Sequence, residues 1–367
     1  MDPYDKKAWE DLERKRQRQL SRPTRHLLPA KGRERAAQLG RTAGDRLRGL
    51  PGSQQAENLV EEVLLGASDA VSKLAASSIA DQRIVRAYQR AGHVSVDEIA
   101  AIRDAVDLRS VDKVKPNFDI AYMTAAGISG AATGFAVSGG EILALVGAAG
   151  GGAAGAAGGA GVGAAPGAGA GAAPGAGLVV GAIAADTAAI LFATARVIFH
   201  TAAYYGYNVN RPTERLRALG VMNFATARTQ MAKNRAYVDL EKLVGLIVRD
   251  ATWKQLDQNV VTKIVRRVFE LLGMRLTKRK LAAAVPLAGI AIGASLNVRT
   301  LSMTADGAEL VYRQQFLCDK YGLPIPSAAP PEASASEDPD EEAEIPLVDI
   351  VEEEIEAPDD EARSQDA

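Results

Sequence analysis

The chain has 367 residues, with 43 Lys or Arg against 45 Asp or Glu and a formal net charge of −2. That balance hides an asymmetry, because residues 327–367 hold 16 of the acids and one basic residue, leaving 42 basic against 29 acidic residues in 1–326. A basic body favours anionic partners, while the lone Cys318 excludes an intramolecular disulfide and a thiolate zinc site.

The N-terminal segment is polar and basic. Residues 1–50 contain fourteen Lys or Arg and seven Asp or Glu, with too little apolar surface for a core. We therefore expect residues 1–55 to form a basic, largely disordered arm, although pairs such as Glu10–Arg14 allow a helix from Tyr4 to Leu20. No apolar run of signal-peptide length occurs here, which argues against secretion and, with the single cysteine, predicts a cytoplasmic protein.

Residues 56–326 are predicted to form one all-α, multi-helix bundle. From Ala56 to Gly92 apolar residues recur at helical spacing, and Gly92 is the predicted stop. Ser95 and Glu98 have the spacing of a capping box in front of the next apolar run. Alternating strand patterns are absent from the sequence.

A low-complexity segment interrupts this domain. Residues 147–177 consist of Gly, Ala and Pro with a single Val, and no charged residue occurs from Ile142 to Ala185. Such a run buries little apolar area and loses much backbone entropy when it is ordered. We therefore expect residues 147–177 to be a flexible insertion.

Further helices are predicted after the insertion, at residues 178–207, 213–234, 240–276, 280–300 and 305–321. Three apolar, Gly- and Ala-rich segments approach the length of a membrane span: 120–140, 178–199 and 281–298. The first consists mostly of small residues, the second carries Asp186 and Arg196, and the third contains Pro286, so each inserts poorly into a bilayer. We therefore favour buried or interfacial helices over spanning ones. Prolines 324 and 326 end the ordered part, and residues 327–367 are predicted to be an acidic, disordered tail.

Two blocks of sequence resemble one known family. From Ala184 the chain reads AADTAAILFATARVIFHTAAYYGYNVNRPTERLRALGVM, which is similar to the central signature of the EcsC protein family. A second block reads PLAGIAIGASLNVRT, followed by AELVYRQQFLCDKYG, and resembles the family's Gly-rich apolar helix and closing helix. The polar motif residues, with the glycine between the two tyrosines, are Asp186, Arg196, Tyr205, Gly206, Tyr207, Glu214, Asn297, Tyr312 and Arg313.

The resemblance covers about residues 56–322, and the 147–177 segment departs from it because the family crosses that region with a shorter apolar hairpin. It implies a bacterial, helical protein, linked by name to an ABC-transporter operon, without a settled biochemical activity.

The motif residues allow two interpretations. Asp186 and Arg196 could be structural charges that pair with groups on other helices, such as Glu214 or Arg313, and fix the helix register. Alternatively, polar groups among apolar neighbours could form the buried site of an enzyme. The residues of that alternative site are Asp186, Arg196, His200, Tyr205, Glu214, Asn297 and Arg313.

Other chemistry-bearing signals are weak. We interpret His200 as a packed or surface histidine, because the three histidines have no metal-ligand spacing. The G-x-G-x-x-G match at residues 150–155 is trivial in such a composition, and neither a preceding strand nor a ribose-binding acid accompanies it. We expect neither a metal nor a cofactor.

A basic amphipathic segment follows residue 254. Its apolar face runs from Leu256 to Leu272, and its cationic surroundings suit either solvent or an anionic bilayer. The candidate contacts to an anionic surface are Lys263, Arg266, Arg267, Lys278, Arg279 and Lys280. Stacking aromatics are sparse, which argues against specific nucleic-acid binding.

The favoured function is therefore that of a non-enzymatic protein, peripheral at the inner face of the cell membrane and accessory to a membrane transport protein. The sequence leaves its oligomeric state open.

Overall fold

The computed structural model describes residues 1–21, 72, 75–118, 174–227, 229–249, 258–283, 289–326 and 345–356. Within helices, it leaves the side chains of residues 174–188, 248–249, 258–259, 276–283, 289–298 and 356 undescribed. The described part of the chain forms ten α-helices and no strand, which confirms the all-α prediction. The apolar segment at 120–140 and most of the predicted insertion, residues 147–173, lie outside the described residues.

The helices, in chain order, are α1 (Pro3–Ser21), α4 (Asp81–Arg90), α5 (Ile99–Ala105), α6 (Leu108–Val114), α9 (Pro174–Tyr204), α10 (Pro212–Thr226), α11 (Gln230–Arg249), α12 (Gln258–Ala283), α13 (Gly289–Tyr321) and α14 (Leu347–Glu356). Both α9 and α10 begin with a proline, which is favourable at the first helical position because the missing N–H has no intrahelical partner there.

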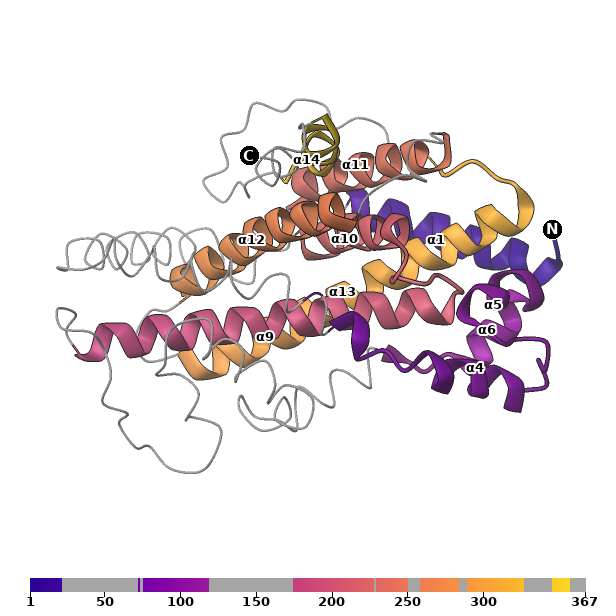
Figure 1. Ribbon diagram of the computed structural model, residues 1–367, viewed down its shortest axis with the longest axis horizontal. Helices are drawn as coiled ribbons and strands as arrows, with labels where there is room; N and C mark the ends of the chain where they lie inside the picture. The colour runs from indigo at the N-terminus through magenta and orange to yellow at the C-terminus, as the bar shows by residue number, and fades with distance from the viewer. Residues whose placement is uncertain are drawn as a thin grey trace, which may run out of the picture.

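Two long helices form the frame of the molecule. α9 and α13 lie side by side and run in the same direction, with α12 running the opposite way beside them (Figure 1). α10 lies at the centre, packed against α9, α11, α12 and α13. Every residue of α10 from Leu216 to Thr226 is buried, because this stretch is apolar almost all round.

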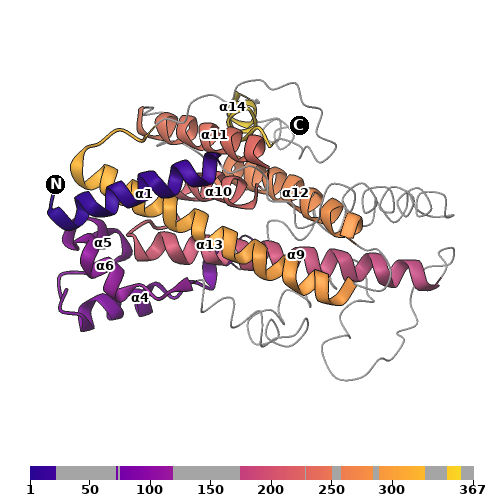
Figure 2. The same cartoon turned by 180° about the vertical axis from the view of Figure 1, so that it is seen from behind.

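The two ends of this frame differ. The short helices α4, α5 and α6 gather with the N-terminus at the end where α9 and α13 finish (Figures 1 and 2). The opposite end holds the starts of α9 and α13 and the end of α12. None of the described helices combines the length and the apolar character that crossing a membrane requires.

The helix that the sequence allowed from Tyr4 to Leu20 is present and belongs to the bundle, while residues 22–55 of the predicted arm lie outside the described residues. Residues 3–21 form α1, which packs against α6, α11 and α13. Its buried positions, Asp5, Ala8, Leu12 and Arg16, recur at helical spacing and give α1 one face toward the bundle. Two of these four buried residues are polar. For this reason, counting apolar residues in the sequence does not predict that this face packs against the bundle.

The acidic tail differs from the expectation. Residues 347–356 form α14, which packs against α11 and α12. Five apolar residues in the run EIPLVDIVEEE are buried: Ile345, Leu347, Val348, Ile350 and Val351. The correction to a wholly disordered 327–367 has a plain cause, because net charge describes the whole tail and conceals this short amphipathic stretch.

Candidate functional site

The site is built on the turn that ends α9. The N–H of Gly206 donates to the carbonyl of Ala203 at 3.1 Å, and that of Tyr207 donates to Ala202 at 2.9 Å. This pair of bonds is a Schellman motif, with Gly206 in the left-handed conformation at φ +84°. A Cβ at Gly206 would lie 2.7 Å from the backbone nitrogen of Arg103, so α5 also packs directly on the turn.

Tyr205 leads into the first of two polar networks. Its buried hydroxyl donates to Oε1 of Glu309 at 2.7 Å, and Oε2 of Glu309 lies 2.9 Å from the Lys115 ammonium. Arg313 lies 3.6 Å from Glu309 and donates to Oδ2 of Asp112 at 2.7 Å. Together with Tyr4, which donates to the same Asp112 oxygen at 2.6 Å, these residues are the Tyr205 network. The network joins α1, α6, α13 and the turn.

Tyr207 leads into the second network, on another side of the turn. Its hydroxyl donates to Oδ2 of Asp319 at 2.8 Å. The guanidinium groups of Arg103 and Arg217 lie over its ring, at 5.7 and 5.4 Å from the centroid. Arg217 also holds Glu214 with contacts of 2.8 and 3.1 Å, so these five residues form the Tyr207 network.

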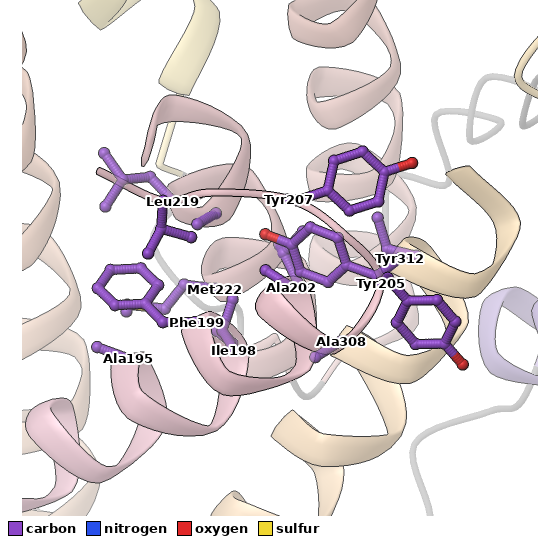
Figure 3. Close-up of a cluster of buried hydrophobic side chains, with 14 of the residues drawn as sticks. Ala195, Ile198, Phe199, Ala202, Tyr205, Tyr207, Leu219, Met222, Ala308 and Tyr312 are labelled. Atoms are coloured by element: carbon purple, nitrogen blue, oxygen red, sulfur yellow. The ribbon is translucent and has the colours of Figure 1, made fainter. Parts of the chain in front are cut away.

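Tyr312 is a residue of α13 that packs against the turn. Its ring packs against the ring of Tyr207 at 5.5 Å between centroids. Figure 3 shows Tyr205, Tyr207 and Tyr312 beside one another with their hydroxyl groups pointing in different directions. The hydroxyl of Tyr312 is buried and has no hydrogen-bond partner among the described residues. Tyr312 therefore contributes packing, whereas the other two tyrosines also contribute hydrogen bonds.

Burial controls the ionisation of this region. It raises the pKa of Tyr205 and of Tyr207 well above the ordinary tyrosine value, and the carboxylates of Glu309 and Asp319 add to the two shifts. Burial also raises the pKa of the Glu214 carboxyl. The two tyrosines therefore remain protonated hydrogen-bond donors at neutral pH, which suits a structural role and not that of a general base.

His200 lies away from these networks. Its ring packs against Phe118 at 4.7 Å and Tyr204 at 5.4 Å between centroids. Burial, together with the nearby positive charge of Arg196, lowers the pKa of His200 to about 4. The imidazole is therefore neutral at physiological pH and packed among aromatic rings, in line with the sequence interpretation.

The motif charges make other partnerships than those expected. The Nε of Arg196 is buried without a hydrogen-bond partner among the described residues. Glu214 pairs with Arg217 on its own helix, and Arg313 pairs with Asp112 and Glu309. The side chains of Asp186 and Asn297 lie outside the described residues, so the structural pairing of Asp186 stays a prediction.

Comparison with known proteins gives one result for this region. Residues 159–317 match the EcsC protein family. The comparisons with curated proteins and with solved structures find no match. The EcsC match covers α9 to α12 and most of α13, and is narrower than the span of 56–322 expected from the sequence.

The EcsC match contains the tyrosine turn, Glu214 and Arg313, but several of their partners lie outside it. Those partners are Tyr4, Arg103, Asp112, Lys115 and Asp319. Sequence reasoning missed all five, and it also missed Arg217 and Glu309. A usable signal existed for Glu309 and Arg217, since each lies three or four residues from a motif residue of opposite charge on the same helix.

The basic candidates on α12 divide into two groups. Lys263 and Arg266 are exposed, whereas Arg267 contacts Glu353 of α14 at 2.8 Å. The side chains of Lys278, Arg279 and Lys280 lie outside the described residues.

One cavity lies within the described part of the chain, away from the motif residues. This cavity, of about 20 Å³, lies between α11 and α13, beside Tyr237 and Gln314, and has room for about one water molecule. The tyrosines of the turn do not line it. Among the described residues, no group of three or more His, Cys, Asp or Glu is placed to hold a metal ion.

Proposed function

We propose that this EcsC-like protein is a non-enzymatic, peripheral membrane protein that binds an anionic bilayer through one end of its helical bundle. Binding of this kind needs apolar surface that enters the lipid interface and cations that contact the headgroups. The gathering of both features at one end of the molecule is the observation that carries the proposal.

The apolar part comes from two helix starts. Residues 174–185 of α9 and 289–298 of α13 contain no charged residue and are rich in Gly, Ala, Ile and Val. Both starts lie at the end of the molecule opposite α4, α5 and α6 (Figures 1 and 2). Their sequences suit shallow insertion at the lipid interface.

The cationic part comes from the end of α12, which lies at the same end of the molecule. Residues 275–280 read RLTKRK. Arg275 is buried and bonded to Asn223, which leaves Lys278, Arg279 and Lys280 as the cations of this segment. On a helix turning by 100° per residue, Lys278 and Arg266 lie about 60° to either side of Lys263. This basic face, which also carries Glu270, extends from the helix end along the outside of the bundle.

The contacts within the two tyrosine networks favour a structural, non-enzymatic role for the motif residues. Their carboxylates are engaged by Lys or Arg and by tyrosine hydroxyls, in contacts that join α1, α5, α6 and α13 to the turn after α9. Networks of this kind fix the arrangement of helices. An accessory role beside a membrane transport protein is the finer form of the proposal, and the resemblance to the EcsC family is its support.

Co-sedimentation with vesicles tests the proposal. We expect the protein to pellet with phosphatidylcholine vesicles that contain one quarter phosphatidylglycerol, and not with phosphatidylcholine alone. Replacing Lys278, Arg279 and Lys280 together by Gln should weaken binding at least about tenfold, because each cation near an anionic surface contributes about 1 kcal/mol.

A matched control uses α4, at the opposite end. Replacing Arg83, Arg86 and Arg90 by Gln removes the same charge from exposed positions and should change binding by less than about twofold. Equal losses of vesicle binding in the two triple variants would mean that the protein binds through its overall positive charge and not through the end of α12. Negligible pelleting of the unaltered protein on both vesicle types would refute the proposal.

A further inference from the structure

α14 docks in a site formed by α11, α12 and part of α10, which we call its seat. Four of its five apolar residues, Leu347, Val348, Ile350 and Val351, are buried, and the helix packs against α11 and α12. Leu347 reaches as far as the central helix α10. A Cβ at Gly220 would lie 3.4 Å from Leu347 and 2.7 Å from Leu240, so the glycine leaves room for both leucines. The seat is therefore continuous with the main core.

Polar contacts fix the start of α14 in this seat. The carboxylate of Asp239 on α11 accepts a hydrogen bond from the backbone N–H of Leu347 at 2.9 Å. The side-chain amide of Asn223 on α10 donates to the carbonyl of Ile345 at 3.1 Å. Arg275 of α12 donates in turn to Asn223 at 3.2 Å. These bonds satisfy backbone groups that a helix end otherwise leaves to water.

The other end of α14 meets the basic face of α12. Glu353 contacts Arg267 at 2.8 Å, and Glu354 lies 3.8 Å from the same guanidinium. Arg267 lies one residue after the exposed Arg266. Asp349 and Glu352 of α14 are exposed. α14 thus neutralises one cation of the basic face and places acidic side chains next to the others.

We propose that α14 is a detachable acidic cover, which competes with an anionic bilayer for the basic face of α12. This inference rests on the proposed function, since it describes how binding through that face is regulated. When α14 is docked, Arg267 is occupied and carboxylates repel an anionic surface. When α14 leaves, Arg267 joins Lys263 and Arg266 as a contact.

The place of α14 in the chain suits such a cover. It follows all other described helices in sequence, so its departure breaks no connection within the bundle. An isolated helix of ten residues is marginal in water, so α14 is stable as a helix only in its seat. Docking therefore has two states, seated and released, and an anionic surface favours the released one.

Two double variants distinguish the effect of the docked α14 on binding from the effect of the tail's overall negative charge. Glu353→Gln with Glu354→Gln removes the contacts to Arg267, whereas Asp349→Asn with Glu352→Gln removes the same charge from exposed positions of α14. We expect the first pair to tighten binding to the vesicles with one quarter phosphatidylglycerol about fivefold, the effect of about one freed arginine. The second pair should have less than half of that effect.

A third variant releases α14 without changing the charge. Ile350→Gln with Val351→Gln removes apolar contacts from the seat and should tighten binding at least as much as Glu353→Gln with Glu354→Gln. Hydrogen exchange follows the helix directly in the unaltered protein. Amides of residues 347–356 should be protected in solution and lose protection when the anionic vesicles are added.

The outcomes are distinguishable. If the unaltered protein binds anionic vesicles but the Gln variants bind no tighter, the cover is refuted and the proposed function stands. Equal tightening by Asp349→Asn with Glu352→Gln refutes the cover in favour of bulk charge. Persistent protection of residues 347–356 on vesicles also refutes it. If no form binds anionic vesicles, both proposals fail.

Discussion

Gly206 meets two independent demands at one position. Its φ of +84° is a conformation that L-residues rarely adopt, and an added Cβ would collide with the α5 backbone. We expect Gly206→Ala to lower the free energy of unfolding by about 3 kcal/mol, as the sum of backbone strain and overpacking. Gly92→Ala is the matched control, since Gly92 has φ +102° with open space around it. It should cost about 1 kcal/mol in urea unfolding; equal losses would contradict a tight α5 contact.

The three tyrosines of the site differ in what their hydroxyls do. Tyr205 donates to Glu309, whereas the buried hydroxyl of Tyr312 has no hydrogen-bond partner among the described residues. Tyr205→Phe should therefore lower the free energy of unfolding by about 1.5 kcal/mol, the contribution of a hydrogen bond to a charged group. Tyr312→Phe should be neutral or stabilising, because it removes a polar group without a partner. A larger loss for Tyr312→Phe in the same urea titrations would show that its hydroxyl is engaged.

His200 couples stability to pH. Its folded-state pKa of about 4 lies below the ordinary value of 6.5, so the unfolded chain takes up the proton first as the pH falls. Stability present above pH 6.5 is thus lost on acidification toward pH 4. Between pH 7 and 5 the unaltered protein should lose about 2 kcal/mol more than His200→Phe, as measured by urea unfolding at each pH. Parallel losses in the two proteins would mean that the imidazole is hydrated.

At the scale of helices, periodicity predicted type better than boundaries. Gly92 follows α4 as the expected stop, in the left-handed conformation. The predicted capping box is wrong, because Glu98 is the N-cap of α5 and makes no side-chain cap bond. The expected helix over 213–234 divides into α10 and α11. The expected segment at 280–300 begins within α12, and its residues from 289 onward join the segment at 305–321 in α13. Tertiary packing overrides local signals of this strength.

The same limit explains what was missed at the site. The tyrosine turn and Arg313 were recognisable from sequence motifs, but Asp112 and Lys115 belong to the region of α6 and meet them only in the folded chain. Arg313 and Asp112 are 201 positions apart. No local spacing encodes such a pair, so the motif residues could be predicted and their partners on distant segments could not.

α1 offers a test of how firmly the N-terminal segment belongs to the bundle. Asp5 is buried and accepts hydrogen bonds from Lys320 at 2.9 Å and from Tyr321 at 2.6 Å. Asp5→Ala should lower the free energy of unfolding by about 2 kcal/mol, because both bonds involve a charged group. Asp11→Ala on the same helix removes an exposed carboxylate and should cost less than about 0.5 kcal/mol. Similar losses in thermal unfolding would mean that α1 docks weakly.

At the scale of the whole molecule, the two ends of the helical bundle differ in composition and in role. The tyrosine networks and the short helices close one end, where accessory segments outside the EcsC match supply partners for motif residues. The other end holds the apolar helix starts and the basic end of α12 (Figure 2). α14 lies beside the basic face as the acidic counterpart. The arrangement separates a rigid scaffold from the surface proposed to meet the membrane.

The charge asymmetry of the chain gives a final prediction. Deleting residues 357–367 removes four acids and one arginine but keeps α14, so it acts through long-range charge alone. It should tighten binding to anionic vesicles about twofold at 0.05 M salt. That gain should vanish at 0.3 M, where the screening length falls to about 6 Å. Deleting residues 327–367 also uncovers Arg267 and the apolar seat of α14, so part of its effect should persist at 0.3 M. If vesicle sedimentation gives the same salt dependence for both deletions, the docked helix adds nothing to the charge of the tail.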